Sequence, residues 1–130
     1  MTVCRGIRGA TTASANDREA ILAATRELLA QIIERNQIAA DDVAAAFFTV
    51  TDDLDAEFPA LAARQLGWTQ AALLCAREIP VPTSKARRCV RVLALVNTDR
   101  AAAEIVHVYL RDAVALRPDI ANGSAPSMES

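Results

Sequence analysis

The stretch CVRVLALV, residues 89–96, is the most apolar run in the chain, and it carries the strongest strand signal, over 90–96. A short apolar run of this kind is typical of a buried strand. Arg91 interrupts it, and a long cation inside an apolar strand costs free energy unless it is paired or lines a cavity. Alternatively, Arg91 ends on a solvated face of the sheet. The run therefore predicts a sheet and, within it, a candidate site residue.

The sequence on either side of this run predicts further strands separated by polar or proline-containing segments. Strands are expected over 3–7, 44–50, 71–76 and 105–110. The stretch GATTAS over 9–14 and the stretch TDDLDAEF over 51–58 are expected to be loops. Pro80 and Pro82 break the chain after the third of these strands, because proline cannot donate to a strand ladder.

Two helices are predicted between the strands. Apolar residues recur at helical spacing over about 17–35, with Asn36 as a stop signal. A capping box is expected at the start of this helix, formed either by Ser14 with Asp17 or by Asn16 with Glu19. A second helix is predicted to begin at Pro59 and to run to about Leu66, with Gly67 as its stop, and Asp99 is expected to cap a short turn through Glu104.

This order of elements, β-α-β-α-β-β-β, predicts an α+β fold with a mixed β-sheet and two main helices. The 130 residues suit a single domain, expected over 1–119, followed by a flexible tail over 120–130 that is small and polar. Hydrophobic residues make up 52% of the chain, but many are alanine and aromatic residues are only 4%. A core of this kind is thin and the sheet has few helices to cover it, so a closed homo-oligomer is expected.

Composition excludes several classes of protein. The net charge is −2 without a block of like charge, which gives no reason to expect a nucleic-acid or membrane partner. The sequence contains neither an apolar run near the ~18 residues of a membrane span nor a signal-peptide pattern, so a cytoplasmic location is expected. Three cysteines without a CxxC spacing, with a single histidine, predict neither a metal site nor a disulfide framework. No dinucleotide or P-loop motif is present, so no phosphate-binding loop is expected.

Several polar residues fit a surface position poorly when they are considered together. Two arginines flank Gly-Ile in the N-terminal stretch RGIRG, and other arginines, one glutamate and one tyrosine lie at predicted strand or helix ends: Arg5, Arg8, Arg64, Glu78, Arg91, Tyr109 and Arg117. Each alone could be solvated. Together, without a nucleophile pair, they predict a site for a small polyanion, since the guanidinium fork binds a carboxylate through two hydrogen bonds.

Six short motifs in order extend this interpretation: RGIRGATT at 5–12, FPA at 58–60, Cys75 with Glu78, CVRV at 89–92, HVYL at 107–110 and LRPD at 116–119. In this order and spacing the chain resembles the monofunctional chorismate mutases of the trimeric, pseudo-α/β-barrel class. The resemblance covers the chain to about Asp119. It implies a homotrimer with active sites between neighbouring subunits, which rearranges chorismate to prephenate for phenylalanine and tyrosine synthesis without a cofactor.

The resemblance also implies residue roles. Arg8 would bind a substrate carboxylate, and Arg91 would face the ether oxygen of the breaking bond. Glu78 would accept the hydrogen bond of the ring hydroxyl, and Tyr109 would lie near the enolpyruvyl group. The implied substrate-binding residues are Phe58, Arg64, Leu74, Cys75, Ala76, Arg77, Leu116 and Arg117. Arg64 would come from the adjoining subunit. Arg5 is expected to pack against a neighbouring element or chain instead.

The sequence departs from the family pattern at three places. Leu61 stands where the family commonly has lysine, Leu74 where it often has threonine, and Pro82-Thr83-Ser84 replaces a glycine pair. Two alternatives are left open. One is a trimeric imine or enamine deaminase of similar fold, although RGIRGATT favours the mutase. The other is a non-catalytic anion-binding trimer, which Leu61 and Leu74 would support.

Overall fold

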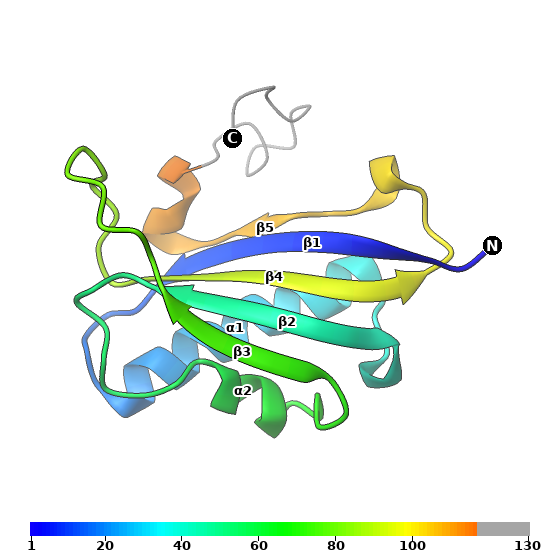
Figure 1. The fold of residues 1–130 in the computed structure, drawn as a ribbon, viewed down its shortest axis with the longest axis horizontal. Helices are drawn as coiled ribbons and strands as arrows, with labels where there is room; N and C mark the ends of the chain where they lie inside the picture. Colours follow the sequence, from blue (N-terminus) through cyan, green and yellow to red (C-terminus); the bar gives the residue numbers. More distant parts are fainter. Residues whose placement is uncertain (117–130) are drawn as a thin grey trace.

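The computed structural model describes residues 1–116, which form one five-stranded sheet with two helices. Both helices, α1 (Arg18–Asn36) and α2 (Ala60–Gln65), lie on the same side of the sheet (Figure 1). The strands are β1 (Val3–Thr12), β2 (Val43–Val50), β3 (Ala72–Arg77), β4 (Cys89–Thr98) and β5 (Val108–Tyr109). The predicted α+β class and the predicted order of elements are confirmed.

The strands are arranged in the order β3-β2-β4-β1-β5. The central strand β4 pairs antiparallel with both β1 and β2, whereas the outer pairs β2–β3 and β1–β5 are parallel. The stretch that first signalled a sheet is therefore its middle strand, flanked on both sides. The side chains of β4 that face the helices are buried, which explains why this strand is the most apolar run of the sequence.

The hydrophobic core lies between the sheet and the helices. From β4 the residues Val90, Val92, Ala94 and Val96 point into it, and all four are buried. Because side chains alternate along a strand, the residues between them face the opposite side. There the large apolar side chains of Phe47, Leu74 and Leu93 are 41%, 58% and 40% exposed. The single chain thus covers one face of its sheet and leaves an open face with exposed apolar groups.

The ends of α1 follow ordinary capping chemistry, but with different residues from those predicted. The carboxylate of Asp17 accepts a hydrogen bond from the Ala20 backbone N–H at 2.8 Å, so Asp17 is the N-cap. The capping-box prediction was wrong because Asn16 bonds instead to the 51–58 loop, where its side chain pairs with Asp55. The predicted stop at Asn36 is confirmed.

Three other local predictions were also wrong. Residues 9–12, expected to be a loop, continue β1 because Gly9–Thr12 pair with β4 as far as Cys89. The predicted last strand over 105–110 is reduced to Val108–Tyr109. Asp99 caps no turn, since it accepts a hydrogen bond from Thr2, and the backbone N–H of Ala101 is satisfied by Glu104 instead.

The expected tail over 120–130 and the site residue Arg117 lie outside the described residues. In the described part of the chain, no helix is long and apolar enough to cross a membrane. A search of the same residues found no group of three histidine, cysteine or acidic side chains placed to hold a metal ion.

Candidate active site

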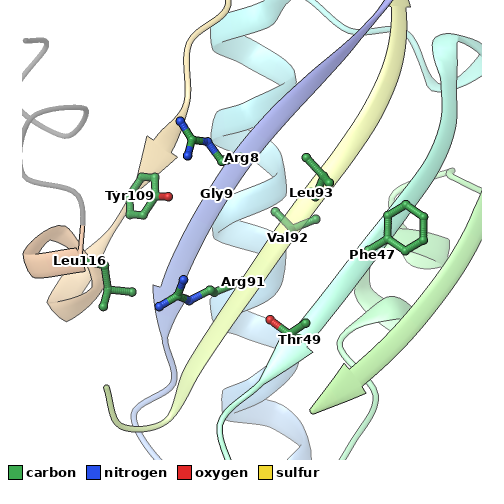
Figure 2. A pocket seen from close by; sticks show the side chains of 9 residues that line it. All are labelled: Arg8, Gly9, Phe47, Thr49, Arg91, Val92, Leu93, Tyr109 and Leu116. Carbon is green, nitrogen blue, oxygen red and sulfur yellow. The ribbon is translucent and has the colours of Figure 1, made fainter. Parts of the chain in front are cut away.

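A pocket of about 480 Å³ lies on the open face of the sheet, over β1, β4 and β2. Figure 2 shows Arg8 and Arg91 on its two sides, with Tyr109 and Leu116 along one edge. Its remaining lining residues are Gly9, Phe47, Thr49, Val92 and Leu93. A volume of this order suits a small organic molecule, and the two guanidinium groups give the pocket a positive character.

The register of β1 and β4 explains why both arginines reach this pocket. Arg8 pairs with Leu93, and Ala10 pairs with Arg91, so the two arginines lie on diagonal positions of adjacent strands. Residues directly across an antiparallel pair point to the same face, and so do positions two residues apart. Both cations therefore leave the sheet on its open side. The cost of placing arginine in an apolar strand is avoided because the Arg91 side chain is 43% exposed.

Glu78 lies next to Arg91 and is held in place from β2. Its Oε1 atom is 3.0 Å from Arg91 Nε, and it accepts a hydrogen bond of 2.7 Å from Thr49 Oγ1. The Glu78 backbone N–H also donates to the carbonyl oxygen of Val50 at 2.8 Å, which continues the β2–β3 pairing by one residue. A carboxylate and a guanidinium are thus fixed side by side, where they can complement groups of opposite polarity in one ligand.

The start of β4 is anchored by the 51–58 loop. Asp53 accepts hydrogen bonds from the Arg88 backbone N–H at 2.9 and 3.0 Å, and Thr51 Oγ1 accepts one from the Cys89 N–H at 2.9 Å. Burial acts to raise the pKa of Asp53, but the hydrogen bonds from Thr51 and Arg88 outweigh it and lower the pKa below 3.8. These contacts hold the strand end that precedes Arg91.

The opposite wall of the pocket is carried by β5 and the 3-10 helix that follows it, Arg111–Leu116. Tyr109 comes from β5 and Leu116 from the end of this helix. Arg111 ties the segment down, since its Nη1 donates to the Thr12 carbonyl at 3.0 Å and its Nε lies 3.2 Å from Glu27 on α1. Side chains, rather than a long ladder, therefore fix this wall.

A second group of the predicted residues lies around β3 and α2. Phe58, Cys75, Ala76 and Arg77 line a separate pocket of about 270 Å³, and Phe58 is 66% exposed. Arg64 is exposed on α2, and its positive charge acts on the Cys75 thiol. Leu74 points to the other face, beside Phe47. Within one chain, these residues do not join the pocket that holds Arg8 and Arg91.

The thiols on both sides of the site stay neutral near pH 7. Burial raises the pKa of Cys75 above 9.0, although the Ala60 backbone and Arg64 act against it. Burial also raises the pKa of Cys89 above 9.0, against the charge of Arg91. A thiolate is the reactive form of cysteine, so neither residue is prepared to act as a nucleophile.

Sequence reasoning identified Arg8, Glu78, Arg91, Tyr109 and Leu116, and the fold brings them to one face. Arg5 was expected to pack against a neighbouring element or chain, and its Nε donates to the Arg100 carbonyl at 3.3 Å. Sequence reasoning missed Thr49 and the hydrogen bond between the Arg8 N–H and His107. Strand alternation could have found Thr49, two residues from Phe47, but no sequence signal pairs residues 8 and 107.

The fold and the pocket together define a class: an α+β protein with one half-covered mixed sheet, whose open face carries an arginine-rich site for a small anionic molecule. Within that class, the family model for chorismate mutase type I matches residues 4–120. The chain belongs to the chorismate mutase type I family.

Individual relatives agree with this assignment. The chain is 55% identical over 117 residues to the chorismate mutase AroH of Thermus thermophilus, covering 89% of this chain and 95% of that protein. It is 44% identical over 117 residues to the chorismate mutase AroH of Bacillus subtilis (strain 168), covering 89% and 91%. A solved structure of a chorismate mutase from Clostridium thermocellum superposes with a TM-score of 0.83 at 50% identity, covering 85% of this chain and 98% of that one.

Proposed function

We propose that this protein is a chorismate mutase that converts chorismate to prephenate by an intramolecular [3,3] rearrangement, in the synthesis of phenylalanine and tyrosine. The observation that carries the assignment is the pair Arg8 and Arg91 on one open sheet face, with Glu78 3.0 Å from Arg91. The family match supports the mutase over the deaminase alternative.

In the proposed mechanism Arg8 binds a carboxylate of the substrate and holds it in a compact, chair-like conformer. Orientation of this kind removes part of the barrier of a unimolecular rearrangement. Tyr109 contacts the enolpyruvyl side chain, and Leu116 covers the bound substrate. Arg8 and Tyr109 are both partly buried and both line the pocket, which supports direct contact of their side chains with a ligand.

The second contribution is electrostatic. In the rearrangement the C–O bond breaks ahead of C–C bond formation, so negative charge grows on the ether oxygen and the ring becomes partly positive. Arg91 is directed at the ether oxygen, and Glu78 accepts the hydrogen bond of the ring hydroxyl. Because Thr49 and Arg91 already hold Glu78, these charges are oriented before the substrate arrives, which is where such stabilisation is most effective.

We also propose that the working enzyme is a homotrimer whose sites lie between subunits. The exposed apolar residues of the open face, Phe47, Leu74 and Leu93, support association through that face. The separation of Phe58, Arg64 and Cys75 from the arginine pocket supports a site completed by a second chain. In this arrangement Phe58 provides an apolar wall for the neighbour's substrate, with Arg64 nearby. Leu74, Ala76 and Arg77 would add backbone and side-chain contacts.

Two further proposals concern the chain as a whole. The single domain is proposed to span 1–119, which the family match over residues 4–120 supports. The cytoplasmic location stays a prediction.

The experiment that tests the function follows the loss of chorismate by ultraviolet absorbance, with prephenate identified as the product. Wild type, Arg91→Ala and Arg35→Ala are compared; Arg35 is a matched control because it bonds only to Gln31 on α1 in the described structure. Removing a donor aimed at developing charge costs about 10²–10³-fold in rate. We expect that loss in Arg91→Ala alone. Conversion by wild type no faster than the spontaneous reaction would overturn the proposal.

A further inference from the structure

The backbone N–H of Arg8 donates a hydrogen bond of 2.9 Å to Nδ1 of His107, a residue 99 positions away in the sequence. Arg8 lies within β1, and His107 comes immediately before β5. His107 does not line the pocket, whereas the residues next to this contact, Arg8 and Tyr109, both do. The hydrogen bond therefore ties the β1 backbone to the side chain of the residue that precedes β5, from outside the pocket.

The register of β1 and β5 shows why a side chain is needed here. The strands pair in parallel at Gly9 with Val108 and Ala10 with Tyr109, and the Ala10 carbonyl accepts from the Leu110 N–H at 2.9 Å. In a parallel ladder, alternate residues of a strand pair with the neighbouring strand, so the backbone N–H that would continue the ladder lies two residues before Ala10. That donor is the Arg8 N–H, and its regular acceptor would be the carbonyl oxygen two residues before Val108.

That carbonyl belongs to Val106, and it accepts a side-chain hydrogen bond instead of one from the Arg8 N–H. Asn36 at the end of α1 donates from Nδ2 to the Val106 oxygen at 2.9 Å, and its Oδ1 accepts from the Val106 N–H at 2.8 Å. Asn36 is 3% exposed and also bonds to the Ile32 carbonyl, so its orientation is fixed. The structure thus bonds Val106 to the end of α1 on both its N–H and its carbonyl, and bonds the Arg8 N–H to the His107 ring.

We propose that His107 is a positioning residue for the rearrangement, because it holds the Arg8 backbone at a fixed place relative to Tyr109. An imidazole Nδ1 that accepts a hydrogen bond belongs to the neutral ring with its proton on Nε2. The inference rests on the proposed function, in which the Arg8 guanidinium binds a substrate carboxylate. Displacing such a group by about 1 Å can cost about 10²-fold in rate.

Three variants separate the hydrogen bond from the bulk of the ring. His107→Asn keeps a hydrogen-bond acceptor at the same distance along the side chain, because the Asn oxygen and the His Nδ1 are both bonded to Cγ. His107→Gln moves the acceptor one bond further from the backbone, and His107→Leu removes it. We expect His107→Asn to keep kcat/KM within about threefold of wild type, and the other two to lose about 10- to 100-fold. Thermal unfolding and the oligomeric state are measured for every variant.

The decisive kinetic test is a double-mutant cycle with Arg8→Ala, which keeps the backbone N–H and removes the guanidinium. If His107 acts through Arg8, His107→Leu lowers kcat/KM by less than about twofold in the Arg8→Ala background. A full additional loss in that background, or equal losses in His107→Asn and His107→Leu, would overturn the proposal.

A second measurement does not depend on activity. Hydrogen exchange of the Arg8 amide, followed by NMR in the substrate-free protein, is expected to be slow in wild type and His107→Asn and faster in His107→Leu. Unchanged protection in His107→Leu overturns the positioning role whatever the kinetics show. An inactive wild type with the expected exchange pattern would instead overturn the proposed reaction and leave the hydrogen bond's structural role in place.

Discussion

The carboxylate of Glu78 lies 3.0 Å from the guanidinium Nε of Arg91, and a hydroxyl from the neighbouring strand fixes the same oxygen. An ion pair this exposed contributes little to stability, because water screens it and competes for both groups. Its importance lies in orientation. The side chains proposed to act on the ether oxygen and on the ring hydroxyl are already held beside each other in the substrate-free protein.

Removal of the Thr49 hydroxyl is expected to weaken catalysis through Glu78. Hydrogen bonds to charged groups contribute about 1.5–3 kcal/mol, so Thr49→Val should lower kcat by roughly 10-fold or more. Glu78→Gln keeps the shape but removes the charge and should have a larger effect. Adding Thr49→Val to Glu78→Gln should then change little. Independent, multiplying losses in the double variant would show that Thr49 acts on something other than Glu78.

Two inactive variants are expected to restore activity when they assemble together. Arg91→Ala damages the pocket on the open face, whereas Arg64→Ala damages the group around α2. In mixed trimers with sites shared between chains, about a quarter of the sites receive an intact Arg91 from one chain and an intact Arg64 from its neighbour. We expect about a quarter of wild-type activity after co-refolding an equal mixture.

The matched control for this experiment mixes Arg91→Ala with Arg8→Ala. Both residues belong to the same pocket of one chain, so no combination of these chains produces an intact site. Activity restored equally in both mixtures, or in neither, would argue against a site completed by a second subunit.

Close packing between β1 and α1 predicts that Gly9 cannot carry a side chain. A Cβ at Gly9 would lie 2.8 Å from Ile32 Cδ1 and 3.1 Å from both Leu28 Cδ1 and the Val108 oxygen. Gly9→Ala is therefore expected to lower the free energy of unfolding by about 1–3 kcal/mol in urea denaturation. Gly6→Ala is the control, since its Cβ would come no closer than 3.4 Å, to Leu93 on the open face. Equal stability of the two variants would contradict this packing argument.

Acid is expected to remove the stabilising contribution of Asp53. The folded-state pKa of Asp53 lies below the ordinary 3.8, so its contribution is complete above that value and disappears as the pH falls through the lower, folded-state pKa. The contribution is about 1 kcal/mol or less, because solvent screens this carboxylate. Urea midpoints of wild type and Asp53→Asn should differ at pH 6 and converge as the pH falls through the folded-state pKa. A constant difference across this range would show that charge is not the cause.

The sequence allowed the helices and the central strand to be predicted because their signals are local. The helical spacing of Ile21, Leu28 and Ile32 is present in the sequence, and so is the apolar run that became β4. The end of β1 could not be found in this way. Residues 9–12 are small or polar, and only their pairing with β4, distant in the sequence, makes them a strand.

The candidate site was predicted by residue type, but not by arrangement. A motif can mark Arg8 and Arg91, yet it contains no information on the register that directs both to one face. The division of the predicted residues between two pockets also depends on tertiary structure, since Leu74 and Cys75 are neighbours in sequence but lie on opposite faces. The hydrogen bonds of Arg8 to His107 and of Asn36 to Val106 both join residues far apart in the sequence, which no local pattern reveals.

The diagonal placement of Arg8 and Arg91 also has a consequence for how the chain reaches its fold. If the pairing of β1 with β4 shifted by one residue, the side chains of one strand would exchange faces of the sheet. The arginine of that strand would then point toward the apolar face of α1. A buried, unpaired guanidinium is costly enough to make that misfolded form unstable. The native register keeps both cations on the open face, and replacing either of them by an apolar residue should make strand misalignment easier.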